Sequence, residues 1–215
     1  QGFDMKLFKT INKSFENIHD NLSFDDTFHT TFDQNPDNLY LRLWELSNYS
    51  IVLGRSNQAE KELHLDLVQK DNIDIIKRSS GGGTVLLGPG CLSYTLFIPI
   101  AAHKRLKTIT DSNLFIMERL KTVLDQAIKN IEIKGHTDLC IKNLKFSGNA
   151  QRRKRHSILF HGTLLYNFDL NLFHKYLAHP SKEPDYRKSR SHLKFVTNLN
   201  IKKDKLEDLV YQITL

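Results

Sequence analysis

Two stretches of the chain combine residue types that can bind and activate an anion. The first, residues 77–94, reads KRSSGGGTVLLGPGCLSY and places three consecutive glycines after two basic residues and two serines. A run of glycine adds nothing to a core, but it permits sharp bends and lets backbone N–H groups come close to a ligand. With ammonium, guanidinium and hydroxyl donors beside it, this loop is suited to a phosphate or a carboxylate. The alternative interpretation is a glycine-rich hairpin turn with incidental charges.

The second stretch, residues 145–165, reads KFSGNAQRRKRHSILFHGTLL. We expect Lys145 at the end of a strand, with Ser147 and Gly148 in a tight turn directly after it. An ammonium fixed there could neutralise charge that develops on a leaving phosphate or an acyl oxygen. A surface lysine in a hairpin is the alternative, and the glycine-rich stretch is what favours the chemical interpretation.

Other common chemistries lack their signatures. The triple glycine has no following lysine as a Walker loop requires, and no spaced Gly-x-Gly-x-x-Gly opens a helix. The ten histidines are scattered without a ligand-spaced pair and a third ligand, so no protein-held metal is predicted. The two cysteines, Cys91 and Cys140, are too few for a disulfide scaffold and fit a reducing compartment. Either could be a nucleophile, although most lone cysteines are small buried hydrophobes.

Composition predicts a cytoplasmic globular protein with an acidic or phosphorylated partner. The net charge is +7 over 215 residues, with basic clusters at 152–155 and 187–190. These clusters lack aromatic interleaving or a helix-turn-helix pattern, so nucleic acid is disfavoured as the partner. No apolar run reaches the roughly 18 to 20 residues of a membrane span, and the first residues do not resemble a signal peptide. We expect residues 1–4 to be an artificial extension before a natural start at Met5.

Periodicity and turn signals predict the elements that must position these residues. Helices are expected over 15–32 with a break near Asn21, and over 61–70, 108–130, 170–176 and 205–213. Asp111 or Ser112 is expected to cap the longest of them. Strands are expected over 39–46 with a hairpin partner at 50–53, and over 72–76, 95–100, 131–133, 138–145 and 157–165.

No repeat, linker or shift in composition divides the chain, which predicts a single domain over residues 5–215. Strands that outnumber the helices grouped between them are typical of an α+β fold with mixed or antiparallel sheets flanked by helices.

The two stretches together resemble the superfamily of lipoate–protein ligases, octanoyltransferases and biotin ligases. The ligase motif Arg-Arg-x-Ser-Gly-Gly-Gly is similar to residues 77–83. The motif Lys-x-Ser-Gly-Ser/Asn-Ala-x-Arg matches residues 145–152, and its ending His-Gly-Thr/Ser-Leu matches residues 161–164. Weaker matches lie at 20–26 and 54–57. Motifs in matching order from residue 21 to about residue 170 are a specific signal.

The resemblance implies a cofactor-transferase fold like that of class II aminoacyl-tRNA synthetases, with an apolar tunnel for lipoate or a medium-chain acyl group. It implies Lys145 as the catalytic residue, lying on the acyl carbonyl and phosphate. It implies the following residues as the substrate and adenylate contacts: Arg78, Ser80, Gly81, Gly82, Gly83, Thr84, Ser147, Gly148, Asn149, Ala150, His161, Gly162 and Thr163.

The implied reaction uses ATP with Mg²⁺ to convert lipoate or octanoate into an acyl adenylate, which a lysine of a carrier protein then attacks. The implied carrier is an acidic lipoyl domain of the 2-oxoacid dehydrogenase E2 or glycine-cleavage H-protein type. Chemistry supports this assignment, because a carboxylate is a poor electrophile until it is activated.

Two departures from the ligase pattern leave alternatives open. Residues 87–91 read Leu-Gly-Pro-Gly-Cys where ligases often have His-Asp and an Asn, and this corner looks more like the octanoyltransferase branch. That branch places its nucleophilic cysteine where Ile158 stands, so an ATP-independent transferase would have to use Cys91 or Cys140. We also expect no accessory C-terminal domain of the kind found in two-domain ligases. A binding subunit that needs a separate accessory chain is therefore a third hypothesis.

Overall fold

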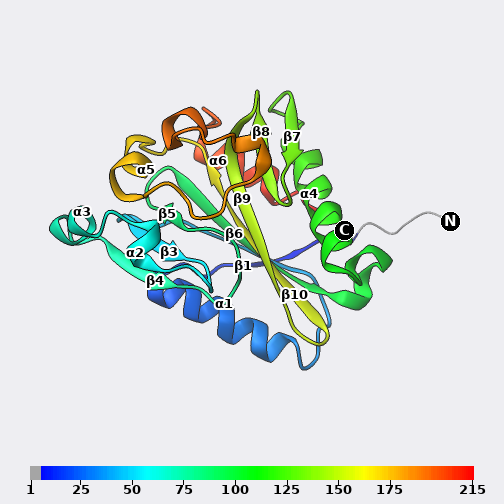
Figure 1. Ribbon diagram of the computed structural model, residues 1–215. Coiled ribbons are helices and arrows are strands. Elements are labelled where there is room, and N and C mark those ends of the chain that lie inside the picture. Colours follow the sequence, from blue (N-terminus) through cyan, green and yellow to red (C-terminus); the bar gives the residue numbers. More distant parts are fainter. Residues whose placement is uncertain (1–5) are drawn as a thin grey trace.

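A seven-stranded sheet organises the computed structural model, which describes residues 6–215 (Figure 1). The expected extension at residues 1–4 and the start at Met5 lie outside the described residues. Along the sheet the strands follow the order β1 (Lys9–Ile11), β2 (Tyr40–Trp44), β6 (Cys91–Pro99), β10 (Ser157–Leu165), β9 (Leu144–Arg153), β8 (Asp138–Ile141) and β7 (Ile131–Lys134).

The centre of this sheet is buried on both faces. Every residue of β6 is buried, and β6 pairs with β10 in antiparallel register along its whole length. Helices α4 (Ile109–Leu124) and α6 (Lys203–Val210) pack on one face, where Leu96 belongs to their apolar core. Helix α1 (Ile18–Phe32) covers the other face, where Phe97 packs against Phe32. Figure 1 shows α1 and α4 on opposite sides of the long central strands.

A second sheet of three strands lies beside the first, in the order β4 (Asp74–Lys77), β3 (Ser50–Leu53) and β5 (Val85–Leu87). The expected hairpin of 39–46 with 50–53 is wrong, because β2 pairs in the large sheet whereas β3 pairs with β4 and β5. Three short helices surround an apolar core that includes the small sheet: α2 (Ala59–Glu62), α3 (Leu65–Lys70) and α5 (Asn171–Tyr176).

Three helix predictions need correction. Helix α1 continues through Asn21, because the buried side-chain amide donates to the carbonyls of Phe15 and Asn17, both at 2.8 Å, instead of breaking the helix. Helix α4 is capped by Thr108, whose Oγ1 accepts from the Asp111 N–H at 3.1 Å, so the cap lies earlier than expected. The helix expected over 61–70 is divided into α2 and α3.

The region around Lys145 differs most from expectation. A turn at Lys142 and Asn143, which have φ of 50° and 62°, joins β8 to β9. Ser147 and Gly148, however, do not form a turn but lie inside β9. One step along β8 corresponds to two steps along β9 between Ser147 and Lys145, so Phe146 is the extra residue of a β-bulge.

After α5 the chain follows an irregular path over residues 177–202, interrupted by the single turns η3 (Asp185–Arg187) and η4 (His192–Lys194). This segment, orange in Figure 1, returns to the large sheet beside β9. There Val196 forms a parallel bridge with Lys145. The irregular segment thereby meets the second sequence motif.

Candidate functional site

A cavity of about 870 Å³ lies where the two sheets meet. Its wall takes residues from β3 and β5 of the small sheet, from β6, β9 and β10 of the large sheet, and from the irregular segment around 178–196. The apolar part of the lining includes Leu22, Trp44, Val52, Val85, Leu86, Leu87, Phe146, Leu165, Phe173, Leu177, Phe195 and Val196. A cavity of this size with so much apolar wall suits a small molecule that has a hydrocarbon portion.

Most of the residues implied by the two motifs meet in this cavity. The lining includes these: Arg78, Gly82, Gly83, Thr84, Lys145, Ser147, Gly148, Asn149, Ala150, His161, Gly162 and Thr163. Ser80 and Gly81 do not line the cavity, and Ser80 is buried. The hydroxyl of Thr84 is buried and has no hydrogen-bond partner among residues 6–215, which leaves it able to bond a ligand.

Arg78 holds the glycine loop in shape. Its Nη2 donates to the carbonyls of Gly81 and Gly83 at 2.7 and 2.8 Å, and its Nε donates to Ser80 Oγ at 3.0 Å. Burial lowers the pKa of this guanidinium to about 10, so it remains charged at neutral pH. Gly82 has a φ of +93°, a left-handed conformation that favours glycine. The structure therefore gives Arg78 mainly the role of shaping the loop.

His161 joins the glycine loop to the large sheet. Its Nε2 lies 2.6 Å from Ser80 Oγ, and the same hydroxyl accepts from Arg78. Burial and the positive charge of Arg78 lower the pKa of His161 to about 3, so the ring is neutral at physiological pH. His161 is therefore a neutral group that links the Ser80 hydroxyl of the glycine loop to β10.

Lys145 reaches the cavity because of the β-bulge. Side chains alternate along a strand, so Lys145 and Gly148, three positions apart, would face opposite sides of a regular strand. With Phe146 as the extra residue they face the same side, and a Cβ added to Gly148 would lie 2.8 Å from both Cε and Nζ of Lys145. The ammonium is 2.8 Å from Asp138 Oδ1, and 29% of the side chain is exposed.

Asn149 of β9 and Gly162 of β10 lie opposite each other in the large sheet. The Asn149 Nδ2 donates to the Thr137 carbonyl at 2.7 Å, and its Oδ1 accepts from the buried Tyr94 hydroxyl. A Cβ on Gly162 would overlap Asn149 Oδ1 and lie 2.9 Å from the Tyr94 ring. The glycine of the His-Gly pair is therefore required by the side chain that crosses it.

The two cysteines are away from the cavity wall. Cys91 is 1% exposed and Cys140 is 0% exposed. Burial raises the pKa of both thiols, and the charge of Glu45 raises that of Cys91 further. A thiol in such surroundings is a poor nucleophile, because the thiolate is the reactive form.

Asp25 is a cavity residue absent from the predicted binding set. Its Oδ1 is 2.8 Å from the buried Arg42 Nη1, and its Oδ2 accepts from Thr95 at 2.7 Å. Burial raises the pKa of Asp25 to about 6, against the opposing effect of Arg42. A sequence signal existed, because Asn21 and Asp25 share the helical stripe of the buried Ile18 and Phe32.

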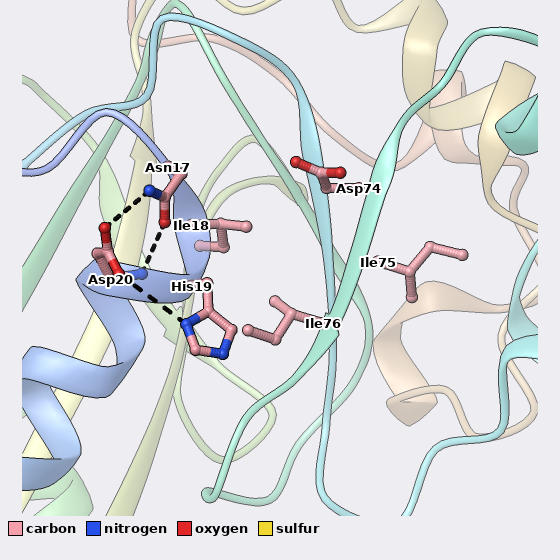
Figure 2. A pocket seen from close by; sticks show the side chains of 7 residues that line it. All are labelled: Asn17, Ile18, His19, Asp20, Asp74, Ile75 and Ile76. Carbon is pink, nitrogen blue, oxygen red and sulfur yellow. Dashed lines mark hydrogen bonds and ion pairs between the residues drawn. The ribbon is translucent and has the colours of Figure 1, made fainter.

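A smaller hollow lies outside this site, between the start of α1 and the edge strand β4 (Figure 2). Asn17 and Asp20 are used locally there, since Asn17 Oδ1 accepts from the Asp20 N–H and its Nδ2 donates to the Asp20 carboxylate, both at 2.8 Å. These two bonds cap the start of α1.

Within residues 6–215, no group of three or more His, Cys, Asp or Glu side chains is arranged to hold a metal ion. In the same part of the chain, no helix has the length and apolar character to cross a membrane.

The chain belongs to the family of the lipoyl protein ligase A/B catalytic domain, whose model matches residues 17–208. The lipoate-protein ligase A of Blochmanniella floridana is 32% identical over 200 residues, covering 90% of this chain and 53% of the relative. The probable lipoate-protein ligase A of Mycoplasma pneumoniae is 29% identical over 157 residues, covering 73% and 45%. The chain thus spans about half the length of the curated relatives it matches.

Solved structures confirm the predicted fold class. A bipartite lipoate protein ligase of Thermoplasma acidophilum, described with its E2 lipoyl domain, has a TM-score of 0.80 at 20% identity, covering 95% of this chain and 81% of that one. P. falciparum LipL1 in complex with lipoate has a TM-score of 0.73 at 22% identity, covering 95% and 60%. A lipoate-protein ligase A bound with ATP has a TM-score of 0.74 at 20% identity, covering 95% and 82%.

Proposed function

We propose that this chain attaches lipoate, or octanoate, to a lysine of a lipoyl carrier domain through an acyl adenylate made from ATP. The observation that carries the proposal is the meeting of Lys145, the glycine loop and His161 around one largely apolar cavity. Membership of the lipoyl ligase family supports it. So do the lipoate-bound and ATP-bound structures of proteins with the same fold.

In the proposed first step, a carboxylate oxygen of the acid attacks the α-phosphorus of ATP, and pyrophosphate leaves. The apolar lining around Trp44, Val52 and Leu86 would hold the acyl chain, and the glycine loop would place its N–H groups beside the phosphate. The Lys145 ammonium would stabilise negative charge as it builds up on the phosphate oxygens. Mg²⁺ would enter with ATP as part of the substrate, held chiefly by the phosphates.

In the proposed second step, the amine of a carrier lysine attacks the acyl carbonyl, loses a proton and displaces AMP to leave an amide. Lys145 would then stabilise the oxyanion of the carbonyl. An acidic lipoyl domain is the carrier that suits a chain with a net charge of +7. We place the reaction in the cytoplasm, where the free thiols of Cys91 and Cys140 would stay reduced.

The contacts of Cys91 and Cys140 favour this route over the transferase with a cysteine thioester. Their buried thiols lie outside the cavity lining, whereas Lys145 is part of it. Replacing both cysteines by serine should therefore leave the acyl transfer intact, and loss of transfer together with loss of a trapped thioester would favour the cysteine route.

A partner-dependent form of the same activity is a second candidate. Its support is that a protein with the same fold is described as a bipartite lipoate protein ligase. In that case the isolated chain would bind lipoyl adenylate without turnover, and turnover would appear when an accessory chain is added.

The deciding experiment incubates the protein with ATP, Mg²⁺, lipoate or octanoate, and an apo lipoyl domain, and measures the mass of the domain. We expect a gain equal to one acyl group that depends on ATP. Lys145→Ala should abolish the gain while the variant keeps its thermal stability. No gain in mass, with or without an accessory chain, and no stabilisation by lipoyl adenylate would refute the proposal.

A further inference from the structure

The irregular segment after α5 holds Lys145 by its backbone. The Lys145 N–H donates to the Phe195 carbonyl at 2.8 Å, and the Lys145 carbonyl accepts from the Thr197 N–H at 2.9 Å. These two bonds make the parallel bridge between Lys145 and Val196. They fix the base of the side chain just where the β-bulge interrupts the pairing of β9 with β8.

The same segment also reaches the tip of the side chain, through one intermediate residue. Tyr186 donates its hydroxyl to Asp138 Oδ2 at 2.7 Å, while Asp138 Oδ1 is 2.8 Å from Lys145 Nζ. One carboxylate therefore uses one oxygen for the tyrosine and the other for the lysine. The hydrogen bond from Tyr186 therefore fixes how the carboxylate is oriented toward the lysine. The ammonium lies beside Gly148, in space that a Cβ at that position would occupy.

The surroundings of Tyr186 keep it a donor. Its ring packs against Phe195 with centroids 5.3 Å apart, and its hydroxyl oxygen accepts from Cys140 Sγ at 3.4 Å. Burial and the neighbouring charge of Asp138 raise the pKa of Tyr186 well above its ordinary value. The hydroxyl thus remains protonated, and its proton stays directed at Asp138.

We propose that Tyr186 is a positioning residue for Lys145, acting through Asp138. The tyrosine fixes the Asp138 carboxylate, and this carboxylate keeps the Lys145 ammonium at the cavity wall. An anionic ligand can then replace the carboxylate as the partner of the ammonium. The catalytic consequence rests on the proposed function, but the geometric claim does not. An ammonium held in place beforehand needs little reorganisation when the reacting phosphate arrives.

The geometric claim can be tested without any activity. Trace acetylation of the folded protein with acetic anhydride, followed by peptide mass spectrometry, measures the reactivity of Lys145 relative to the exposed Lys129. We expect Tyr186→Phe, which keeps the ring and removes the hydroxyl, to raise this ratio about 3- to 10-fold by loosening the ion pair. The control Tyr211→Phe changes an exposed tyrosine and should leave the ratio unchanged. A ratio within about twofold of the parent in Tyr186→Phe overturns the claim.

The catalytic claim is tested by lipoate-dependent exchange between ATP and pyrophosphate. We expect Tyr186→Phe to lower kcat about 10-fold while KM for lipoate and ATP changes less than about twofold. In an Asp138→Asn background, Tyr186→Phe should cause no further loss, because the tyrosine acts through that carboxylate.

Additive losses in the double variant, or a change in KM alone, would overturn the catalytic claim. An unchanged kcat would do the same. If the parent protein shows neither exchange nor carrier acylation, the proposed function fails by itself, and the acetylation ratio still decides whether Tyr186 positions Lys145.

Discussion

Arg78 and Lys145 are both cations of the cavity wall, yet the two sides of the cavity use them differently. Arg78 is 8% exposed, and its guanidinium donates to Ser80 and to the loop carbonyls of Gly81 and Gly83. Lys145 has a more exposed side chain whose ammonium is held by Asp138. A cation bonded mainly to backbone shapes the wall, whereas one held by a single carboxylate can exchange that partner for a ligand.

The largest expected effect separates these roles. Lys145→Met should lower the rate of acyl transfer about 10²- to 10³-fold, because it removes one preorganised cation. Arg78→Met should instead lower the free energy of unfolding by about 2–4 kcal/mol, because no guanidinium remains to donate to Ser80 and to the loop carbonyls of Gly81 and Gly83. Urea unfolding and the carrier acylation assay measure the two quantities on the same samples.

The matched control is Arg78→Lys, which keeps the charge but cannot reproduce the forked set of hydrogen bonds. It should be destabilised almost as much as Arg78→Met. If Arg78→Met unfolded at the same urea concentration as the parent while losing lipoate binding, Arg78 would be a ligand contact and the contrast with Lys145 would disappear.

A smaller effect on stability is expected when a glycine of the large sheet is compared with a glycine of the loop that Arg78 shapes. Gly162→Ala places its Cβ against Asn149 and should lower the free energy of unfolding by about 1–3 kcal/mol. Gly83→Ala meets nothing within 4 Å and should change it by less than about 0.5 kcal/mol. Thermal and urea unfolding test this order. Equal losses would show that the glycine loop packs more tightly than its geometry indicates.

The smallest effect concerns the contact between the two sides, Ser80 with His161. The folded-state pKa of His161 is lowered to about 3, whereas an unfolded histidine titrates near 6.5. The unfolded chain therefore takes up the proton first, and stability is full above pH 6.5 and falls as the pH drops toward 3. Between pH 7 and pH 5, His161 should therefore lower the free energy of unfolding by about 1–2 kcal/mol.

Two other buried groups titrate in the same range. His29, whose pKa burial and the charge of Lys154 lower to about 4, adds a loss of the same sign. Asp25, whose pKa is raised to about 6, has the opposite effect between its unfolded value of 3.8 and 6. Urea unfolding of His161→Gln at several pH values isolates the first contribution, and the variant should show a shallower dependence. An unchanged slope would mean that His161 takes up its proton in the folded state as readily as in the unfolded chain.

The residues that make up the site could be predicted from the sequence better than the strand pairing that places them. The motifs around Gly82, Lys145 and His161 have fixed spacing, so their residues could be named, and the cavity brings most of them together. The pairing of 50–53 could not be predicted, because an alternating pattern indicates a strand without indicating its neighbour. Ser147 and Gly148 suggested a turn for a related reason. Serine and glycine are common in turns, so their presence in a strand cannot be told from a turn by residue type alone.

Tyr186 and Thr108 show two further limits. Tyr186 lies in an irregular segment with no periodicity, and only the folded path brings it 2.7 Å from an acid 48 positions earlier. For the start of α4, several capping residues stood close together in the sequence, and Thr108 rather than Asp111 or Ser112 occupies the position. Where several residues satisfy a local rule equally well, tertiary packing makes the choice.

The extra residue in β9 makes the site sensitive to a kind of mutation that substitution scans do not sample. Deleting Phe146 would remove the bulge but leave Lys145 and Gly148 two positions apart in a regular strand, so both would still face the same side. Inserting one residue between Phe146 and Gly148 while the bulge remains would instead turn Lys145 to the opposite face, although every motif residue would still be present. The spacing between the lysine and its glycine, counted with the bulge, is therefore as much a part of this site as their identities.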